Sequence, residues 1–390
     1  MEEVKDEIEL NRNLSVDLAT NHGEPSECLL KKIIAFELTI PLTVINEEKA
    51  SIEVKTVSFY KCHFYQPLKL QHIDQNISFE DCVFYSEVNA FNATFNGKTR
   101  FRNCEFKENT NFYNSKFNGL ADFWKSTFFK PITFYKTDFN DTAVFSAVTF
   151  NENVLFTYSL FASKTIFGRT TFNKGLDISQ SIISGELQPF DLAFEFTKYV
   201  TEYIGNDDDK FRKYIHLENK IPLINKVATF QVLKNTYAKQ SNHIDEITMR
   251  QQEKKAYSQL TQFRKLDKNW TKNTSGDRFI LWLNRWSNNY KSDFRNGILF
   301  TSSVAIIFLL LTLTTTEEFW NRICFNCEID WSVIGYTVKQ FINFLNPAHS
   351  INYIDELYPF YGIPYVFDFL GRIAVGYGIY QTVQAFRKFR

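Results

Sequence analysis

The feature that most constrains this chain is a series of phenylalanines separated alternately by five and six residues. An α-helix repeats every 3.6 residues or so and a strand every 2, so neither element produces this spacing. The series holds Phe79, Phe84, Ala90, Phe95, Phe101, Phe106, Phe112, Phe117, Phe123, Phe128, Phe134, Phe139, Phe145, Phe150, Phe156, Phe161, Phe167, Phe172, Ile178 and Ile183. A large ring required at one place in every unit predicts a solenoid of stacked repeats.

A small residue stands two places before many of these positions. Its occurrences are Cys82, Ala93, Cys104, Ser115, Ala121, Ser126, Ala143 and Ser159. In this respect the chain resembles the pentapeptide-repeat family, in its variant with an 11-residue double unit, as in the segments 101–106 and 123–128. The resemblance covers residues 57–185. It implies an all-β domain, a right-handed quadrilateral β-helix with the phenylalanine rings stacked inside.

The spacing also predicts which rings lie above one another. Two double units make 22 residues per coil, which aligns Phe79, Phe101, Phe123, Phe145 and Phe167. Adjacent coils are then separated by about 4.8 Å, the distance between hydrogen-bonded strands. No coil can bury its large side chains alone, so stacking is expected to supply the stability.

The N-terminal end of the solenoid is less regular. A further coil is expected to begin at Phe59, because the segment 58–64 repeats at 78–84 with an offset of 20. Residues 1–56 form an N-terminal region, in which 28–57 are expected to form strands or a cap over the open end.

Three cysteines fall in one column of the predicted solenoid, Cys62, Cys82 and Cys104. A metal or redox column is one interpretation. The other is that cysteine fills the inward position as a small apolar residue, as alanine and serine do elsewhere in the series. The second interpretation is favoured.

Residues 186–296 are expected to form a helical connector. Helical periodicity is clearest in the segments 221–234 and 244–257, and the break at 241–243 predicts a hairpin of two helices. Pro189 is expected to end the rod. The apolar face of the hairpin requires a neighbour, either the end of the rod or a second subunit, and the sequence leaves both open.

Residues 297–390 are expected to form two transmembrane helices joined by an outer loop, 317–360. The segment 297–315 has no charge, and the segment 364–386 carries only Asp368 and Arg372; each is long enough to cross a hydrocarbon core of about 30 Å. Trp282 and Trp286 precede the first span as interfacial aromatics.

Charge gives the expected orientation. Residues 250–295 contain eleven Lys or Arg against four acidic residues, and the acidic N-terminus has no apolar run behind it. Both termini are therefore expected in the cytoplasm. These features predict a multi-pass protein of a bacterial inner membrane, with anionic headgroups as ligands of the basic stretch.

One stripe of the second span has functional interest. Asp368, Gly371, Ala374, Gly378, Gln381 and Ala385 follow one another at steps of three and four residues, and Arg372 stands four residues from Asp368. The stripe either packs against another helix or lines a pore in an oligomer, and packing is favoured. The letters Val375 to Gly378 match a potassium-channel filter, but too few residues follow for an inner helix, and they are interpreted as chance.

Two features mark the outer loop. Cys324 and Cys327 form a CxxC motif, which is either a disulfide or half of a metal site, and the disulfide is favoured. The segment 342–349 is either a re-entrant segment or a surface helix ended by Pro347.

No enzyme is expected, because the sequence contains no phosphate-binding glycine loop, HExxH motif or nucleophile elbow. No cofactor or metal is expected. Lys plus Arg equals Asp plus Glu at 44 each, which gives no reason to expect nucleic acid. Some pentapeptide-repeat proteins imitate DNA and bind gyrase, but residues 51–185 hold fourteen basic against twelve acidic residues, so the rod lacks the acidity that mimicry needs.

Two functions follow. The leading prediction is a membrane-anchored scaffold that binds an unknown protein partner along its rod and forms a homo-oligomer. The alternative is an oligomeric ion channel or membrane-permeabilising effector gated by the cytoplasmic domain.

Overall fold

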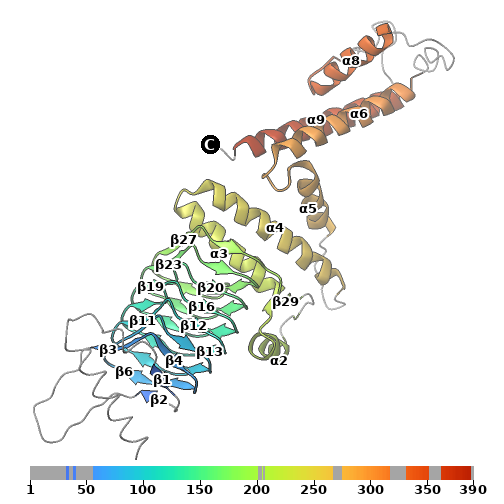
Figure 1. The fold of residues 1–390 in the computed structure, drawn as a ribbon. Coiled ribbons are helices and arrows are strands. Elements are labelled where there is room, and N and C mark those ends of the chain that lie inside the picture. The colour runs from blue at the N-terminus through green and yellow to red at the C-terminus, as the bar shows by residue number, and fades with distance from the viewer. Residues whose placement is uncertain are drawn as a thin grey trace, which may run out of the picture. The chain divides into compact units, whose positions relative to one another are not determined.

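The computed structural model describes residues 32–34, 38–40, 56–200, 204, 207–266, 275–316, 331–350 and 362–387. The chain divides into two compact units (Figure 1). The first contains residues 1–240 and 262–267, and the second contains 241–261 and 268–390.

Four parallel sheets make up most of the first unit, and successive coils contribute one strand to each sheet. One sheet contains β1 (Lys32–Ile34), β4 (Cys62–Phe64), β8 (Val83–Phe84), β12 (Glu105–Phe106), β16 (Thr127–Phe128), β20 (Thr149–Phe150), β24 (Thr171–Phe172) and β28 (Ala193–Phe194). The next contains β2 (Leu38–Ile40), β5 (Leu68–Leu70), β9 (Val88–Asn89), β13 (Thr110–Asn111), β17 (Ile132–Thr133), β21 (Val154–Leu155) and β25 (Leu176–Asp177). The third contains β6 (His72–Ile73), β10 (Thr94–Phe95), β14 (Lys116–Phe117), β18 (Asp138–Phe139), β22 (Leu160–Phe161) and β26 (Ile182–Ile183). The fourth contains β3 (Thr56–Tyr60), β7 (Asn76–Glu80), β11 (Thr99–Arg102), β15 (Ala121–Asp122), β19 (Ala143–Val144), β23 (Thr165–Gly168) and β27 (Leu187–Phe190).

This is a β-solenoid of about seven coils, as the phenylalanine spacing predicts. Its register advances by 22 residues per coil, so that Phe79 pairs with Phe101. At the N-terminal end the offset is 20, because Phe59 pairs with Phe79. The first described strands, β1 and β2, pair with β4 and β5 and add to two of the sheets.

The core of the solenoid consists of stacked phenylalanine rings. Phe101 stacks on Phe79 with ring centres 4.8 Å apart, and Phe123 stacks on Phe101 at 5.5 Å. Phe145 and Phe167 continue the column at 5.2 Å and 5.0 Å. All five side chains are buried. Burial of each ring stabilises the fold by about 2 kcal/mol, and ring pairs add roughly 1 kcal/mol.

The small residue two places before a ring fills an inward position, and where it is serine or cysteine its side chain can donate a hydrogen bond to the preceding coil. The Ser126 hydroxyl donates to the Phe101 carbonyl (2.7 Å), and the Cys104 thiol donates to the Phe79 carbonyl (3.4 Å). The column of Cys62, Cys82 and Cys104 thus performs the same packing role as serine does elsewhere, and among the described residues no group of three His, Cys, Asp or Glu could hold a metal ion.

One outer edge carries an asparagine ladder with the same period. The Asn96 amide donates to Asp74 (2.6 Å), Asn118 donates to Asn96 (2.6 Å), and Asn140 donates to Asn118 (2.8 Å). Each of these side chains therefore binds the equivalent side chain one coil away. These hydrogen bonds favour the same register between coils as the backbone hydrogen bonds do.

The rod does not end at Pro189, contrary to expectation. Pro189 lies inside β27, where it pairs with Phe167, and β28 follows it. Since β27 is the last strand of its sheet, the missing N–H of Pro189 breaks no ladder bond. The strands therefore continue beyond residue 185, to Phe194.

A helix closes this end of the solenoid. After β29 (Tyr199–Val200), α2 (Asp208–Arg212), the π-helical turn η2 (Lys213–Leu217) and β30 (Ile221–Pro222), α3 (Leu223–Lys239) covers the last coil. Asn225 donates to the buried Asp177 carboxylate (2.8 Å), and the Ile178 N–H donates to Thr229 (3.2 Å). Of the two neighbours left open for the first connector helix, the structure shows the end of the rod.

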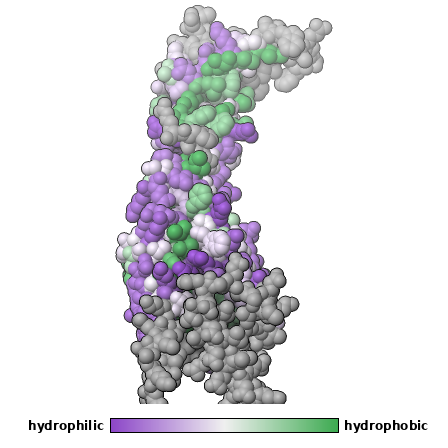
Figure 2. All heavy atoms as spheres, turned by 60° about the vertical axis from the view of Figure 1, so that its left-hand side comes forward, coloured by the Kyte–Doolittle hydropathy of each residue, from purple (hydrophilic) through white to green (hydrophobic). Residues whose placement is uncertain are grey.

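The second unit is helical. Its elements are α4 (His243–Leu266, of which 262–266 cluster with the first unit), α5 (Ser275–Asn288), α6 (Phe294–Thr314), α8 (Trp331–Leu345) and α9 (Ile363–Phe386). The predicted break between the connector helices is present at 240–242. Figure 2 shows hydrophobic residues gathered in the upper part of the view, where α6 and α9 lie, whereas hydrophilic residues dominate elsewhere on the coloured surface of this face.

Candidate functional site

The antiparallel pair of α6 and α9 is the frame of the candidate site. Gly297 lies against Thr382, and Gly378 lies against Thr301. The residue number therefore increases along one helix as it decreases along the other, and the two helices are antiparallel. A Cβ atom on Gly378 would lie 2.5 Å from the Thr301 hydroxyl oxygen. Glycine on each helix therefore permits the close approach of the two backbones.

The predicted stripe lies on the face of α9 that packs against its neighbours. Asp368, Gly371, Gly378 and Gln381 are buried, and Ala374 is half-buried at the edge of this face. A Cβ on Gly371 would lie 2.4 Å from the Phe344 ring of α8 and 2.9 Å from Phe308 of α6. Within one chain the stripe thus contacts α6 and α8 along its length.

A charged cluster stands at the N-terminal end of this stripe. Asp368 is only 1% exposed. Arg372, four residues later on α9, donates from Nε to Asp368 Oδ2 (2.8 Å), and its Nη2 also lies 2.8 Å from that oxygen. His349, just after α8, places Nε2 2.9 Å from Oδ1. Both oxygens of the buried carboxylate therefore have cationic or polar partners, as burial of a charge requires.

His349 has a partner at each ring nitrogen. Its Nδ1 lies 2.7 Å from the Asn346 carbonyl oxygen, and its Nε2 faces the Asp368 carboxyl group. The ring therefore joins the end of α8 to α9. Such a cluster can hold a helix pair together, and it contains no nucleophile or metal-binding set.

Sequence reasoning found the Asp368–Arg372 pair but missed His349. The two helix residues are four apart, which is a local signal, whereas His349 stands 19 residues before Asp368 and no spacing rule connects them. In the segment 342–349 that was considered re-entrant, α8 ends at Leu345, two residues before Pro347. Phe344 is fully buried in a cluster with Ala305, Leu309 and Val375.

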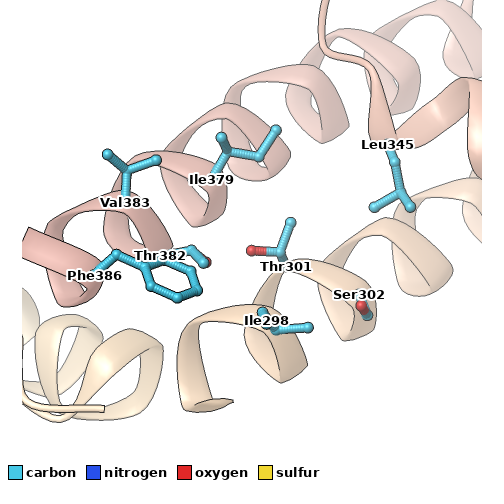
Figure 3. A pocket seen from close by; sticks show the side chains of 8 residues that line it. All are labelled: Ile298, Thr301, Ser302, Leu345, Ile379, Thr382, Val383 and Phe386. Atoms are coloured by element: carbon cyan, nitrogen blue, oxygen red, sulfur yellow. The ribbon is translucent and has the colours of Figure 1, made fainter. Parts of the chain in front are cut away.

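A shallow apolar groove runs along α6 and α9 (Figure 3). It is lined by Ile298, Thr301 and Ser302 of α6, Ile379, Thr382, Val383 and Phe386 of α9, and Leu345 of α8. The hydroxyls of Thr301 and Thr382 already donate to carbonyls of their own helices. The groove therefore offers little polar recognition and no chemistry for an aqueous substrate.

The CxxC pair, Cys324 and Cys327, lies outside the described residues, so the disulfide stays a prediction.

The outside of the solenoid carries a second candidate surface. Tyr65, Tyr85, Lys107 and Phe129 occupy equivalent positions of successive coils and are here called the aromatic column. The rings of Tyr65 and Tyr85 stack at 4.6 Å, and the Lys107 ammonium lies 3.9 Å from the centre of the Phe129 ring. Tyr65, Tyr85 and Phe129 are each about 40% exposed or more. Exposed rings in a row are typical of interaction surfaces.

Strands of two to five residues, four parallel sheets and a register of 22 residues define a β-solenoid of the repeat-protein class. Residues 79–127 and 90–137 match the family of pentapeptide repeats (9 copies). Pentapeptide repeats therefore form residues 79–137 of the solenoid. No curated protein and no solved structure matches the chain.

Proposed function

We propose that the chain is a non-enzymatic scaffold, in which helices α6 and α9 anchor a cytoplasmic pentapeptide-repeat rod to a membrane. The observation that carries this proposal is the apolar outer surface of the helix pair. On α6, Leu299, Ile306 and Leu310 are each about half exposed. A water-soluble helix pair would bury such side chains or replace them with polar ones.

Helix α6 gives the stronger support. Among the described residues it alone is long and apolar enough to cross a membrane by length and composition. Helix α9 falls short because Asp368, Arg372 and Gln381 lower its mean hydropathy. Those side chains face inward or pair with one another, while Val366, Phe369, Leu370 and Ile373 are exposed on its outer face. Its lipid-facing composition is therefore that of a second span.

The position of Asp368 fits an anchoring role. The 24 residues of α9 are about 36 Å long, and Asp368 is five residues from its first residue, or about 8 Å along the axis. A hydrocarbon core of about 30 Å leaves this cluster near one edge of the bilayer. The free energy needed to place a charged side chain there is lower than at the midplane of the bilayer. The contacts of Asp368 with His349 and Arg372 offset much of this free-energy cost.

The charges outside the helices support a cytoplasmic location for both termini. Arg295 is the second residue of α6, and Arg387 follows α9, so both lie at the same end of the antiparallel pair. Basic residues concentrate on the cytoplasmic side of membrane proteins. The rod is taken as right-handed and quadrilateral; four sheets per coil and the handedness of parallel crossovers support this.

Fractionation of full-length protein tests the anchor. The chain should stay with membranes after alkaline carbonate extraction, because α6 and α9 would be embedded. Ile306→Arg, on the outer face of α6 near its middle, should lower the retained fraction about tenfold or more, since a central arginine costs roughly 2.5–3.5 kcal/mol. Phe129→Arg on the rod is the matched control and should leave it unchanged. Recovery of the wild-type chain in the soluble fraction would overturn the proposal.

The aromatic column is the surface that we assign to a protein partner. A photoreactive amino acid at Tyr85 should give one discrete cross-linked product in cells. The same group at Asn96, on the asparagine ladder, should give none. Equal products at both positions would argue against this assignment.

A second candidate function is an ion channel formed by several copies. The buried Asp368 cluster favours it, because ionisable side chains within a span often mark ion pathways. Purified protein in liposomes would then conduct ions, and Asp368→Ala would change the flux. A monomer that leaves the liposomes sealed would exclude the channel and leave the anchor standing.

A further inference from the structure

Helix α5 exposes large apolar side chains that a helix of a soluble protein would bury. Phe279, Ile280, Trp282 and Trp286 point outward, and each side chain is between 53% and 60% exposed. The rings of Trp282 and Trp286 stack with centres 5.6 Å apart. These four side chains are here called the α5 outer face.

The opposite side of α5 holds Leu281, Asn284 and Asn288 and is already bound within the second unit. Tyr377 donates from its hydroxyl to Asn284 (3.1 Å), and the Asn288 amide donates to the Gln381 carbonyl (3.1 Å). Asn288 is fully buried. The helix therefore cannot rotate to hide its rings against α9 without breaking these hydrogen bonds.

A tight turn fixes α5 relative to α6. Asn289, Tyr290 and Lys291 have φ of 49°, 60° and 74°, three successive side-chain-bearing residues in the left-handed region. The Asn288 side chain accepts from the Lys291 N–H (2.9 Å), and Tyr290 is buried. Figure 1 shows α5 turning away from the line of α6 rather than continuing it. The turn thus holds α5 at an angle to the apolar helix at its first residues.

Positive charge gathers beside this turn. Burial, and then Arg250 and Arg387, lower the pKa of the Lys291 amine, while Glu246, which pairs with Arg250, acts in the opposite direction. The three cations therefore outnumber the one carboxylate among these groups. Arg285 lies on α5 itself and is exposed. The outward tryptophans are suited to the apolar boundary of the acyl chains. The cationic cluster is suited to the negative headgroups of an anionic bilayer.

We propose that α5 lies in the plane of an anionic membrane surface, with the α5 outer face inserted at the boundary between headgroups and acyl chains. This inference rests on the proposed anchoring by α6, whose first residue is only six positions after the end of α5. It adds a second, independent contact with lipid. An in-plane helix fixed to the first residues of a span sets the depth of that span in the bilayer.

Tryptophan fluorescence tests the proposal. The chain has six tryptophans, two of them on α5, so a full-length variant with the other four changed to Phe reports on Trp282 and Trp286 alone. It is reconstituted into vesicles that contain phosphatidylglycerol, with bromine placed either near the glycerol end or near the methyl end of the acyl chains. We expect quenching about twofold stronger or more from the shallow bromines, as for an interfacial helix.

Two controls separate the possible failures. A variant that retains only Trp124, an exposed residue of the rod, should show no quenching by brominated lipid. Flotation of the same vesicles reports on the anchor. If the protein floats but Trp282 and Trp286 are not quenched, the inference about α5 is wrong while the anchor stands. If the protein does not float, the anchor itself fails. Loss of a detergent-stable dimer on Trp282→Ala and Trp286→Ala, without lipid quenching, would assign this face to a second copy and overturn the proposal.

Discussion

Inside the solenoid, the cysteine thiols form hydrogen bonds with backbone carbonyl groups. Cys82 and Cys104 donate to carbonyls of the preceding coil and are fully buried. The hydrogen bond with Cys104, together with burial, raises the pKa of the Cys82 thiol. Since the thiolate is the reactive species, the column should be chemically inert.

We therefore predict that Cys82 and Cys104 resist alkylation. With a maleimide at pH about 8, both should react at least about a hundredfold more slowly in the folded chain than in urea. Peptide mapping by mass spectrometry measures this. Reaction at the unfolded rate would contradict the assignment of these thiols to packing.

Lys226 of α3, the helix that covers the last coil, should make the free energy of unfolding depend on pH. Lys226 Nζ lies 3.8 Å from the centre of the Tyr199 ring, and desolvation lowers the pKa of its amine from 10.5 to about 8. Between these values the unfolded chain binds more protons than the folded chain. The free energy of unfolding should therefore rise as pH increases from about 8 to 10.5.

Replacement of Lys226 by Met should remove this rise, and at pH 7 it should stabilise the solenoid by about 1 kcal/mol. Urea unfolding at neutral and alkaline pH measures both effects. The same pH slope in wild type and variant would show that this amine does not cause it.

At the scale of elements, the contact between α6 and α9 depends on where glycine stands. Gly378→Val places atoms within 3 Å of Thr301, and we expect a loss of about 2–3 kcal/mol in the stability of the helix pair. Gly376→Val is the matched control, because the nearest atom to its Cβ is 4.0 Å away, on Pro347. Thermal unfolding in detergent should separate the two variants. Equal losses would contradict the packing geometry.

The elements differ in how far the sequence predicts them. The solenoid is predictable because one requirement, a ring at a fixed place, recurs in every coil and leaves a period that can be read directly. The contact of His349 with Asp368 is not, since it joins separate elements and no period links them. The continuation past Pro189 is missed because proline is excluded from central strands but not from the last strand of a sheet. For α5, the sequence indicates Trp282 and Trp286 as interfacial aromatics, but which face of the helix points outward depends on the partners that Asn284 and Asn288 find on α9.

At the scale of the whole molecule, the division into two compact units predicts two unfolding transitions. Phe123 is fully buried and stacks between Phe101 and Phe145, so Phe123→Ala should cost about 3–5 kcal/mol. Only the transition of the strands should shift. Circular dichroism in detergent, followed at wavelengths for strand and for helix, measures this.

Phe129→Ala serves as the control for that experiment, because Phe129 is 39% exposed. It should shift neither transition by more than about 0.5 kcal/mol. A single transition that moves as a whole in Phe123→Ala would show that the two units unfold together.

The 22-residue register of the coils from Phe79 onward has a consequence for how the length of the solenoid can evolve. Excision or tandem duplication of one 22-residue block leaves every ring, hydroxyl and amide opposite its equivalent, because each coil contacts only its neighbours. Gene segments of that size can therefore be gained or lost without redesign, and each event changes the reach of the platform by one increment of about 4.8 Å. A block of another length keeps the columns aligned only if a turn absorbs the difference, as in the 20-residue coil between Phe59 and Phe79. The length of the solenoid can therefore change in evolution in whole coils.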